Sequence, residues 1–185
     1  GGGRGRVGGR RGSGLAGEAV GRVAFDPDGR LQLGDSPAEC QATIRAFLPS
    51  ADLVKLSDDE VEFVTGCADE RAAAEQLLAG GCKLVLITRG ANGSAVYTKT
   101  AEAFADTLSV PVTDTTGAGD SFIGSFLYQL TRDGVDADGL SALSQSQLAQ
   151  YLRFSAQSAS LTVQHKGAVM ATLDQLKQAY PDCTE

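Results

Sequence analysis

Residues 114–122 combine small residues and acids in an order that suits phosphate chemistry. They read Asp-Thr-Thr-Gly-Ala-Gly-Asp-Ser-Phe and lead into an apolar segment, which predicts that a helix begins near Gly117. The first N–H groups of a helix have no partner within it, and small residues let an anion approach them closely. An acid beside such a site can accept a proton from a hydroxyl. The candidate catalytic residues are therefore Gly117, Ala118, Gly119 and Asp120.

Asp120 also has a simpler explanation, because acids are common near the positive end of a helix. Spacing alone does not separate this explanation from a role as a base. Neither common nucleotide fingerprint is present: there is no G-x-x-x-x-G-K-[ST], and Phe122 stands where a dinucleotide-binding turn needs a third glycine.

The bulk composition restricts the classes of protein to which the chain can belong. Its 185 residues are 42% apolar, which is enough for one domain with a substantial core. No apolar run is long enough to cross a bilayer, so we expect no membrane partner. Residues 23–185 carry 11 basic and 22 acidic residues, and this negative charge disfavours nucleic acid as a partner.

The four cysteines indicate reduced thiols. They include no C-x-x-C pair, and the single histidine, His165, is too little for a zinc site. We therefore expect a cytoplasmic protein, or a plastid one if a transit peptide precedes this sequence.

Residues 1–22 differ from the rest of the chain. They contain ten glycines and five arginines and have no apolar periodicity. Such a segment buries too little surface to offset its ordering entropy, so we expect it to be disordered. An RNA-binding arginine-glycine arm is the alternative, and the acidic remainder of the chain argues against it.

Residues 23–185 have the pattern of an α/β domain. We expect strands at 23–25, 51–55, 83–87, 94–98 and 102–105, and helices at 37–48, 57–64, 69–79, 117–130, 147–163 and 172–180. Because most strands alternate with helices, the sheet should be largely parallel.

Residues 114–124 resemble the C-terminal signature of the PfkB, or ribokinase-like, family of sugar and nucleoside kinases. In that family the aspartate is the catalytic base and the Gly-Ala-Gly backbone is the anion hole, which implies these roles for Asp120 and 117–119. Other segments agree in order: 54–66 looks like the fructokinase form of the Asn-x-x-Glu motif, and 86–94 is similar to the nucleotide-binding turn. Residues 25–30 and 161–168 also resemble family segments.

The resemblance implies ligands for several residues. ATP would contact Thr88, Gly90, Asn92, Gly93, Gly117 and Gly119. Glu60 would order water around Mg²⁺, although Ser57-x-x-Glu60 is also a helix capping box. Asp114 and Thr116 would coordinate a monovalent cation such as K⁺, although an Asp-Thr pair also stabilises a turn.

Together these features predict a ribokinase-like fold with a mostly parallel sheet flanked by helices, incomplete because the N-terminal half and lid of the family have no counterpart. We expect residues 23–185 to be the C-terminal part of a PfkB-type kinase domain, either a fragment or a degenerate relative. The implied activity is ATP-dependent phosphorylation of fructose to fructose 6-phosphate, with a homodimer in the full-length form. The alternatives are a ribokinase or nucleoside kinase, and a non-catalytic interaction subunit.

Overall fold

The computed structural model of this chain describes residues 22–27 and 36–183. The strands in this part are β1 (Ala24–Phe25), β2 (Leu53–Ser57), β3 (Leu84–Thr88), β4 (Ser94–Tyr97) and β5 (Glu102–Ala105). The α-helices are α1 (Pro37–Phe47), α2 (Asp58–Thr65), α3 (Glu70–Ala79), α4 (Ala118–Arg132), α5 (Gln145–Thr162) and α6 (Leu173–Ala179). Short 3₁₀ turns occur at Leu48–Ser50, Gly90–Asn92, Gly139–Ala142 and Pro181–Cys183.

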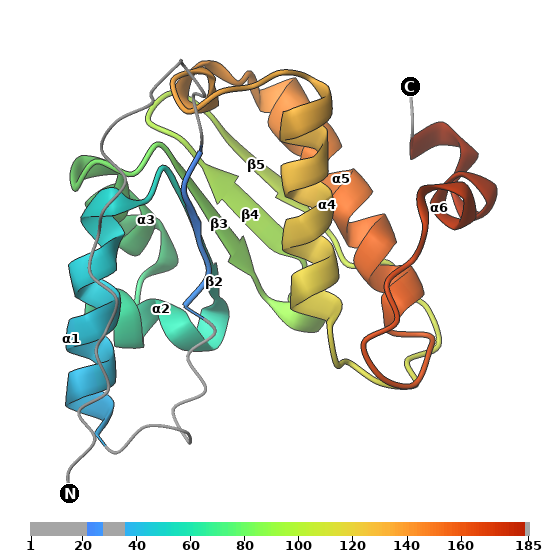
Figure 1. Cartoon of the computed structure of the whole chain (residues 1–185), viewed down its shortest axis with the longest axis horizontal. Coiled ribbons are helices and arrows are strands. Elements are labelled where there is room, and N and C mark those ends of the chain that lie inside the picture. The colour runs from blue at the N-terminus through green and yellow to red at the C-terminus, as the bar shows by residue number, and fades with distance from the viewer. Residues whose placement is uncertain (1–21, 28–35, 184–185) are drawn as a thin grey trace, which may run out of the picture.

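The described strands form one sheet in the order β1-β2-β3-β4-β5 (Figure 1). β1, β2 and β3 pair in parallel, whereas β4 is antiparallel to both β3 and β5. Four of these five strands therefore point the same way, which confirms the predicted mostly parallel sheet. β4 runs backwards because only a short turn separates it from β3, and a parallel partner would need a long crossover.

Side chains of β2 and β3 alternate between two buried layers. Val54 and Leu56 lie in the layer under α2 and α3, whereas Leu53 lies in the layer under α4 and α5. Both strands are buried on both faces, and the nearly all-apolar sequence of β3 is typical of such a strand.

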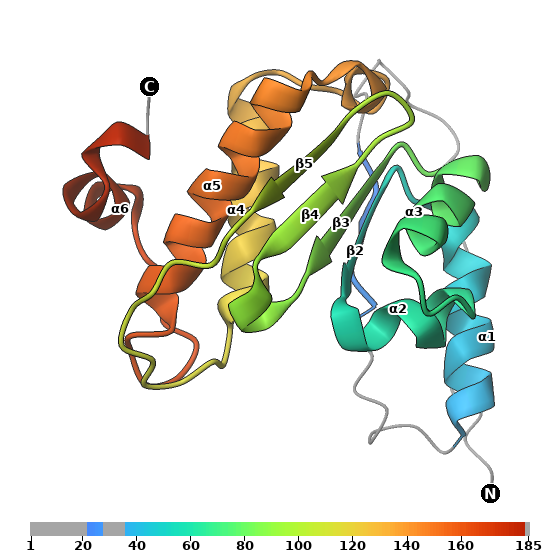
Figure 2. The ribbon, with the colours of Figure 1, turned by 180° about the vertical axis from the view of Figure 1, so that it is seen from behind.

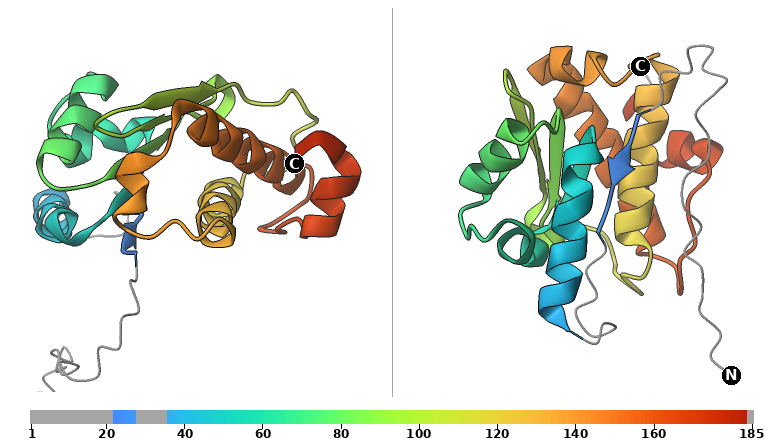
Figure 3. Two further views of the ribbon diagram at one scale, coloured as in Figure 1. Left: turned by 90° about the horizontal axis from the view of Figure 1, so that it is seen from above. Right: turned by 60° about the vertical axis from the view of Figure 1, so that its left-hand side comes forward.

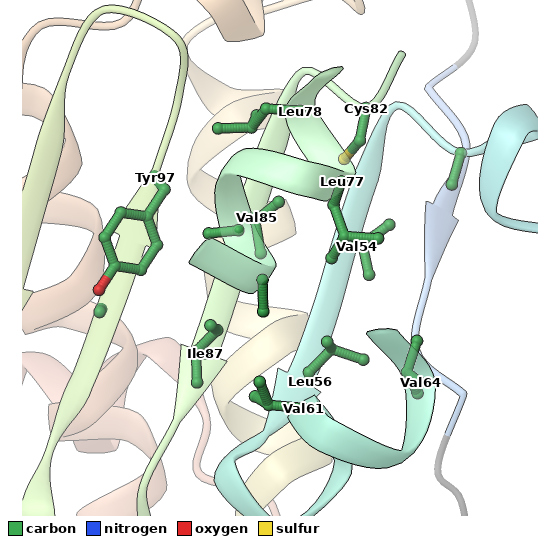
Figure 4. Packing of buried hydrophobic residues seen from close by; sticks show 14 of the residues in the cluster. Val54, Leu56, Val61, Val64, Leu77, Leu78, Cys82, Val85, Ile87 and Tyr97 are labelled. Atoms are coloured by element: carbon green, nitrogen blue, oxygen red, sulfur yellow. The ribbon is translucent and has the colours of Figure 1, made fainter. Parts of the chain in front are cut away.

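Helices α1, α2 and α3 lie on one side of the sheet (Figures 1 and 2). In this layer Val61 and Val64 from α2 and Leu77 from α3 pack on the strand residues Leu56 and Ile87 (Figure 4). Each such side chain contributes roughly 1.5–3 kcal/mol when it is fully removed from water.

Helices α4 and α5 lie side by side against the opposite face of the sheet (Figure 3). Their contact includes Phe126 and Tyr151, whose rings meet edge to face with centroids 5.7 Å apart. Helix α6 lies beyond α5 and away from the sheet, and its Leu176 packs on Phe154 of α5 (Figure 2). The face that carries α4 and α5 also carries the candidate site.

All six predicted helices are present, with ends shifted by a residue or two. Helix α5 begins at Gln145 rather than at residue 147, because Ser144 and Gln147 form a capping box that fixes an earlier start. In the described part of the chain, every helix is too short or too polar to cross a membrane. The disorder predicted for residues 1–22 falls, except for Arg22, outside the described residues, as do Asp28, Gly29 and Arg30 of the 25–30 segment.

Candidate active site

Helix α4 begins with a tight turn that leaves two amides without a partner. Gly117 is the N-cap and has φ of 81°, a left-handed conformation that favours glycine. The amide of Ala118 donates to the carbonyl of Thr115 at 3.1 Å. Among the described residues, the amides of Gly119 and Asp120 have no backbone or side-chain acceptor. These two N–H groups sit at the positive end of a 15-residue helix, where an anion is stabilised.

Three buried hydroxyls hold this helix start in place. The Oγ of Ser121 lies 3.0 Å from the Oγ of Ser158 and 3.0 Å from the Oγ1 of Thr162. Ser121 belongs to the first turn of α4, whereas the other two residues belong to α5. The hydroxyl chain therefore fixes the free amides relative to α5.

Asp120 is exposed in the first turn of α4, beside the free amides. No hydrogen bond or ion pair engages its carboxylate among the described residues, so both oxygens are available to a ligand. This position suits a base that takes a proton from a bound hydroxyl. The structure therefore brings the predicted base and the predicted anion hole together, although the chemical role of Asp120 stays a prediction.

Asp114 ties the turn before α4 to the loop after α5. Its Oδ1 accepts hydrogen bonds from the amide and hydroxyl of Thr116 at 2.9 and 2.7 Å, and its Oδ2 accepts one from the amide of Gly167 at 2.8 Å. These hydrogen bonds, with the Thr116 amide contributing most, lower the pKa of Asp114 below its ordinary value. The amides of Thr113 and Asp114 also donate to the carbonyl of Val163 at the end of α5.

The turn between β3 and β4 requires glycine at two positions. Gly90 and Gly93 have φ of 51° and 87°, and a Cβ on Gly93 would lie 2.3 Å from the carbonyl oxygen of Ala105. Thr107 braces the turn: its hydroxyl donates to the carbonyl of Gly90 at 2.6 Å and accepts from the amide of Gly93 at 3.1 Å. The turn is therefore held in one shape by Thr107 and by its own backbone hydrogen bonds.

A cavity of about 300 Å³ lies between this turn and the start of α4. The predicted ligand-contacting residues Thr88, Gly90, Gly93, Ala118 and Gly119 all line it. Its other walls are mostly apolar and come from the 108–112 loop, from Phe122, from Ala156 and Ala159 of α5, and from Val163 directly after α5. The lining does not include Asn92, Gly117, Asp120, Glu60, Asp114 or Thr116. A mostly apolar cleft with a few backbone donors is the usual form of a small-molecule site.

Glu60 lies at the carboxyl edge of the parallel strands. Ser57 ends β2 directly beside Thr88, which ends β3, and this edge is where open parallel sheets bind ligands. The amide of Ser57 donates to the Glu60 carboxylate at 2.7 Å, as part of a capping box. The capping explanation is therefore confirmed, whereas the metal role of Glu60 stays a prediction.

Two features of the site were missed by the sequence reasoning. Thr107 gave no signal, because a threonine in a loop is ordinary. Lys55 did give a sequence signal, because it is a lysine within the mostly apolar strand β2. In the structure it lies next to Gly119 at the start of α4.

A ribokinase-like fold is the class that this arrangement defines, and residues 18–175 match the pfkB family of carbohydrate kinases. The chain therefore belongs to the pfkB family. The match begins inside the segment 1–22 and covers all the predicted site residues.

Among individual proteins, fructokinase-2 of Solanum lycopersicum is 35% identical over 158 residues, which are 85% of this chain and 47% of that protein. The chain spans about half the length of the curated relatives that it matches first.

Solved structures agree with the family assignment. A fructokinase with bound ATP from Xylella fastidiosa has a TM-score of 0.77 at 32% identity, over 89% of this chain and 53% of that one. A fructokinase double mutant from Vibrio cholerae O395, in a form that binds fructose, ADP and potassium ion, has a TM-score of 0.68 at 30% identity, over 84% and 47%. A ribokinase from Thermotoga maritima, at 22% identity over 88% and 50%, shares the fold with a TM-score of 0.66.

Proposed function

We propose that this chain carries the ATP-binding and phosphoryl-transfer residues of a sugar kinase, and that the sugar is fructose. The observation that carries this proposal is that the free amide of Gly119 opens onto the same cavity as the Gly90 and Gly93 turn, with Asp120 exposed beside it. Membership of the pfkB family supports the reaction class, and the fructokinase relatives support the sugar.

In this proposal ATP spans the cavity from its apolar to its polar end. The adenine and ribose pack against Ala156 and Ala159 of α5 and against Val163 directly after it, because these residues form apolar walls. The triphosphate then runs past the glycine turn to the amides of Gly119 and Asp120. The ATP bound to the Xylella fastidiosa fructokinase supports this ligand.

The transfer step needs a base and a site for negative charge. A hydroxyl oxygen of the sugar bonds to the γ-phosphorus while the bond from that phosphorus to the β–γ bridging oxygen breaks. The hydroxyl proton passes to Asp120, and ADP leaves with the electron pair of the broken bond. The amides of Gly119 and Asp120 donate to the phosphoryl oxygens and stabilise their charge in the transition state.

Mg²⁺ held by the nucleotide would neutralise part of the phosphate charge. Mg²⁺ prefers oxygen ligands and keeps several waters, so few protein groups need to touch it. Glu60 fits such a role because of its place: it lies in the first turn of α2, directly after β2 ends at the carboxyl edge of the parallel strands. Within residues 22–27 and 36–183, no group of three or more His, Cys, Asp or Glu residues could hold a metal by itself, which suits a metal carried by ATP.

A monovalent cation is the second ion in the proposal. The Oδ1 of Asp114 already accepts two hydrogen bonds, whereas Oδ2 accepts one and keeps a lone pair. That lone pair and the hydroxyl oxygen of Thr116 are the expected ligands. The potassium ion in the Vibrio cholerae fructokinase structure supports this assignment.

The test separates nucleotide binding from sugar choice. Calorimetric titration of the chain with ATP should give a Kd within the range of about 1 μM to 1 mM that is typical of enzyme substrates. An ADP-release assay should then respond to fructose more than to ribose or adenosine, in this chain or in a longer form that includes the other half of the relatives. Absence of ATP binding would overturn the proposal, whereas a preference for ribose or adenosine would overturn only the sugar.

A further inference from the structure

Lys55 is a buried cation in an otherwise apolar strand. Its side chain is 9% exposed, and its strand neighbours Val54 and Leu56 are fully buried. Because side chains alternate along β2, Lys55 points to the face that carries α4, opposite to these two neighbours. An ammonium group in such a place is costly unless it is paired.

Asp26 is the partner of Lys55. The Nζ atom lies 3.1 Å from Oδ2 and 3.3 Å from Oδ1 of Asp26. The contact follows from the sheet register, because Phe25 pairs with Val54 and the next residue of each chain segment is then Asp26 or Lys55. Among the described residues Asp26 is the one hydrogen-bonding partner of the Lys55 ammonium. An ammonium has three hydrogens and one carboxylate has two oxygens, so at least one N–H remains.

The remaining N–H lies next to the free amides of α4. The Nζ of Lys55 is 3.5 Å from the position that a Cβ on Gly119 would take, which places the ammonium in contact with the start of α4. Two kinds of donor therefore meet at the start of α4: neutral amides from Gly119 and Asp120, and a charged ammonium that β2 holds in place.

We propose that Lys55 donates to the transferred phosphoryl group, and that Asp26 acts as the positioning residue that holds the ammonium beside Gly119. The proposal rests on the proposed function, because it names a further residue of the same phosphate site. Lys55 forms no covalent bond in the step. Its charge balances the negative charge on the phosphoryl oxygens, which amide dipoles alone balance only in part.

A purely structural alternative exists, in which the ion pair only joins β1 to β2. The chain offers a matched control for it, because Lys83 makes the same kind of contact away from the start of α4. The Nζ of Lys83 lies 3.2 Å from Asp52 and 3.0 Å from Asp138. Neutralising Lys83 therefore removes two ion pairs and leaves the phosphate site intact.

The experiment titrates the ¹⁵N-labelled full chain with inorganic phosphate at constant ionic strength and follows amide shifts. We expect the Gly119 and Asp120 amides to shift in the wild-type chain. Lys55→Met should weaken phosphate binding about tenfold, the loss expected for one charge-assisted hydrogen bond. Asp26→Asn should weaken it less, and Lys83→Met should leave it unchanged. Unmoved Gly119 and Asp120 amides in the wild type, or a Lys55→Met titration like that of the wild type, would overturn the proposal.

A second measurement needs no variant and so does not depend on folding of Lys55→Met. Acetylation of wild-type lysines by acetic anhydride is followed by peptide mass spectrometry with and without phosphate. Phosphate should slow acetylation of Lys55 several-fold and leave Lys83 unchanged, whereas equal rates at Lys55 would contradict the proposal. Neither measurement uses nucleotide or sugar, so the two proposals can fail separately. A chain that binds phosphate through Lys55 without binding ATP would keep Lys55 as a phosphate ligand and reject the kinase.

Discussion

A Cβ on Gly117 would lie 2.8 Å from the Cβ of Ala168, a distance that real side chains do not reach. Gly117 starts α4, whereas Ala168 belongs to the loop after α5, so two segments distant in sequence meet where the free amides begin. The contact explains why the first glycine of the Gly-Ala-Gly sequence cannot carry a side chain. Gly117 also has a left-handed backbone conformation, which is a second reason why glycine is needed at this position.

Gly117→Ala should therefore destabilise the chain and disturb the anion site. The left-handed backbone costs about 1–2 kcal/mol with a Cβ, and the collision adds to it. Chemical denaturation measures the loss. Gly124→Ala is the matched control, because Gly124 lies within α4 with open space around it and should gain up to about 1 kcal/mol in the free energy of unfolding. Adding Ala168→Gly to Gly117→Ala should restore the share of the free energy of unfolding that was lost to the collision. If nothing is restored, the left-handed backbone alone accounts for the destabilisation.

Asp120→Asn should lower turnover while leaving ATP binding almost unchanged. A general base contributes about 10²–10⁴-fold to rate, and an amide cannot take the proton. Steady-state ADP release and ATP calorimetry give the two quantities. Asp174→Asn is the matched control, because Asp174 is also an acid in the first turn of a helix, α6, and lies outside the site. Near-normal turnover in Asp120→Asn would rule this residue out as the base.

Glu60 has a capping role and a proposed metal role, and two substitutions separate them. Glu60→Gln keeps a side-chain oxygen that can accept from the Ser57 amide, so the capping box should persist, whereas the Mg²⁺ concentration for half-maximal activity should rise. Ser57→Ala should cost about 0.5–1 kcal/mol in stability and leave the Mg²⁺ requirement unchanged. If both variants have the wild-type Mg²⁺ requirement, Glu60 is only a cap.

Glu70 makes the stability of the chain depend on acid pH. Burial raises its pKa, but hydrogen bonds from Arg89 and from Tyr97 at 2.8 Å outweigh this effect, so the pKa lies below its ordinary value of 4.5. The stabilisation is fully present above pH 4.5 and is lost as the pH falls through the lowered pKa.

Tyr97→Phe removes one of these hydrogen bonds. This substitution should lower the free energy of unfolding at neutral pH by about 1 kcal/mol. It should also make the decrease in that free energy between pH 5 and 3 shallower; this window follows from the pKa of a carboxyl in the unfolded chain. Tyr128→Phe is the control, because that exposed ring stacks on Phe154 and should leave the pH profile unchanged. Urea denaturation at several pH values measures both variants; parallel profiles for Tyr97→Phe and the wild type would contradict the assignment.

Much of the fold follows from local pattern. Apolar runs such as 84–87 predict buried strands, and capping residues such as Asp69 and Thr172 predict helix starts, because both signals act within a few residues. The extra two residues of α5 needed the reciprocal contact of Ser144 with Gln147, which a periodicity argument overlooks.

The site was only partly predictable for the same reason. The glycines of 117–119 and 90–93 could be recognised from the sequence, because the backbone conformations that need glycine are set by neighbouring residues. The walls of the cavity come from α5 through Ala156 and Ala159, and small apolar residues on a helix carry no signal of what they face. Lys55 and Asp26 meet only through the pairing of β1 with β2, a contact across 29 positions of sequence.

Asp114 has a mechanical consequence for the molecule. One of its oxygens secures the turn before α4 and the other secures the loop that contains Gly167, while Val163 holds both residues 113 and 114. These hydrogen bonds join the end of α5, the proposed nucleobase wall, to the start of α4, the proposed phosphate site. Because the two segments are tied together, a ligand that shifts one of them also shifts the other, so a nucleobase bound beside Val163 and a phosphate bound at Gly119 should each change the affinity for the other by the same factor.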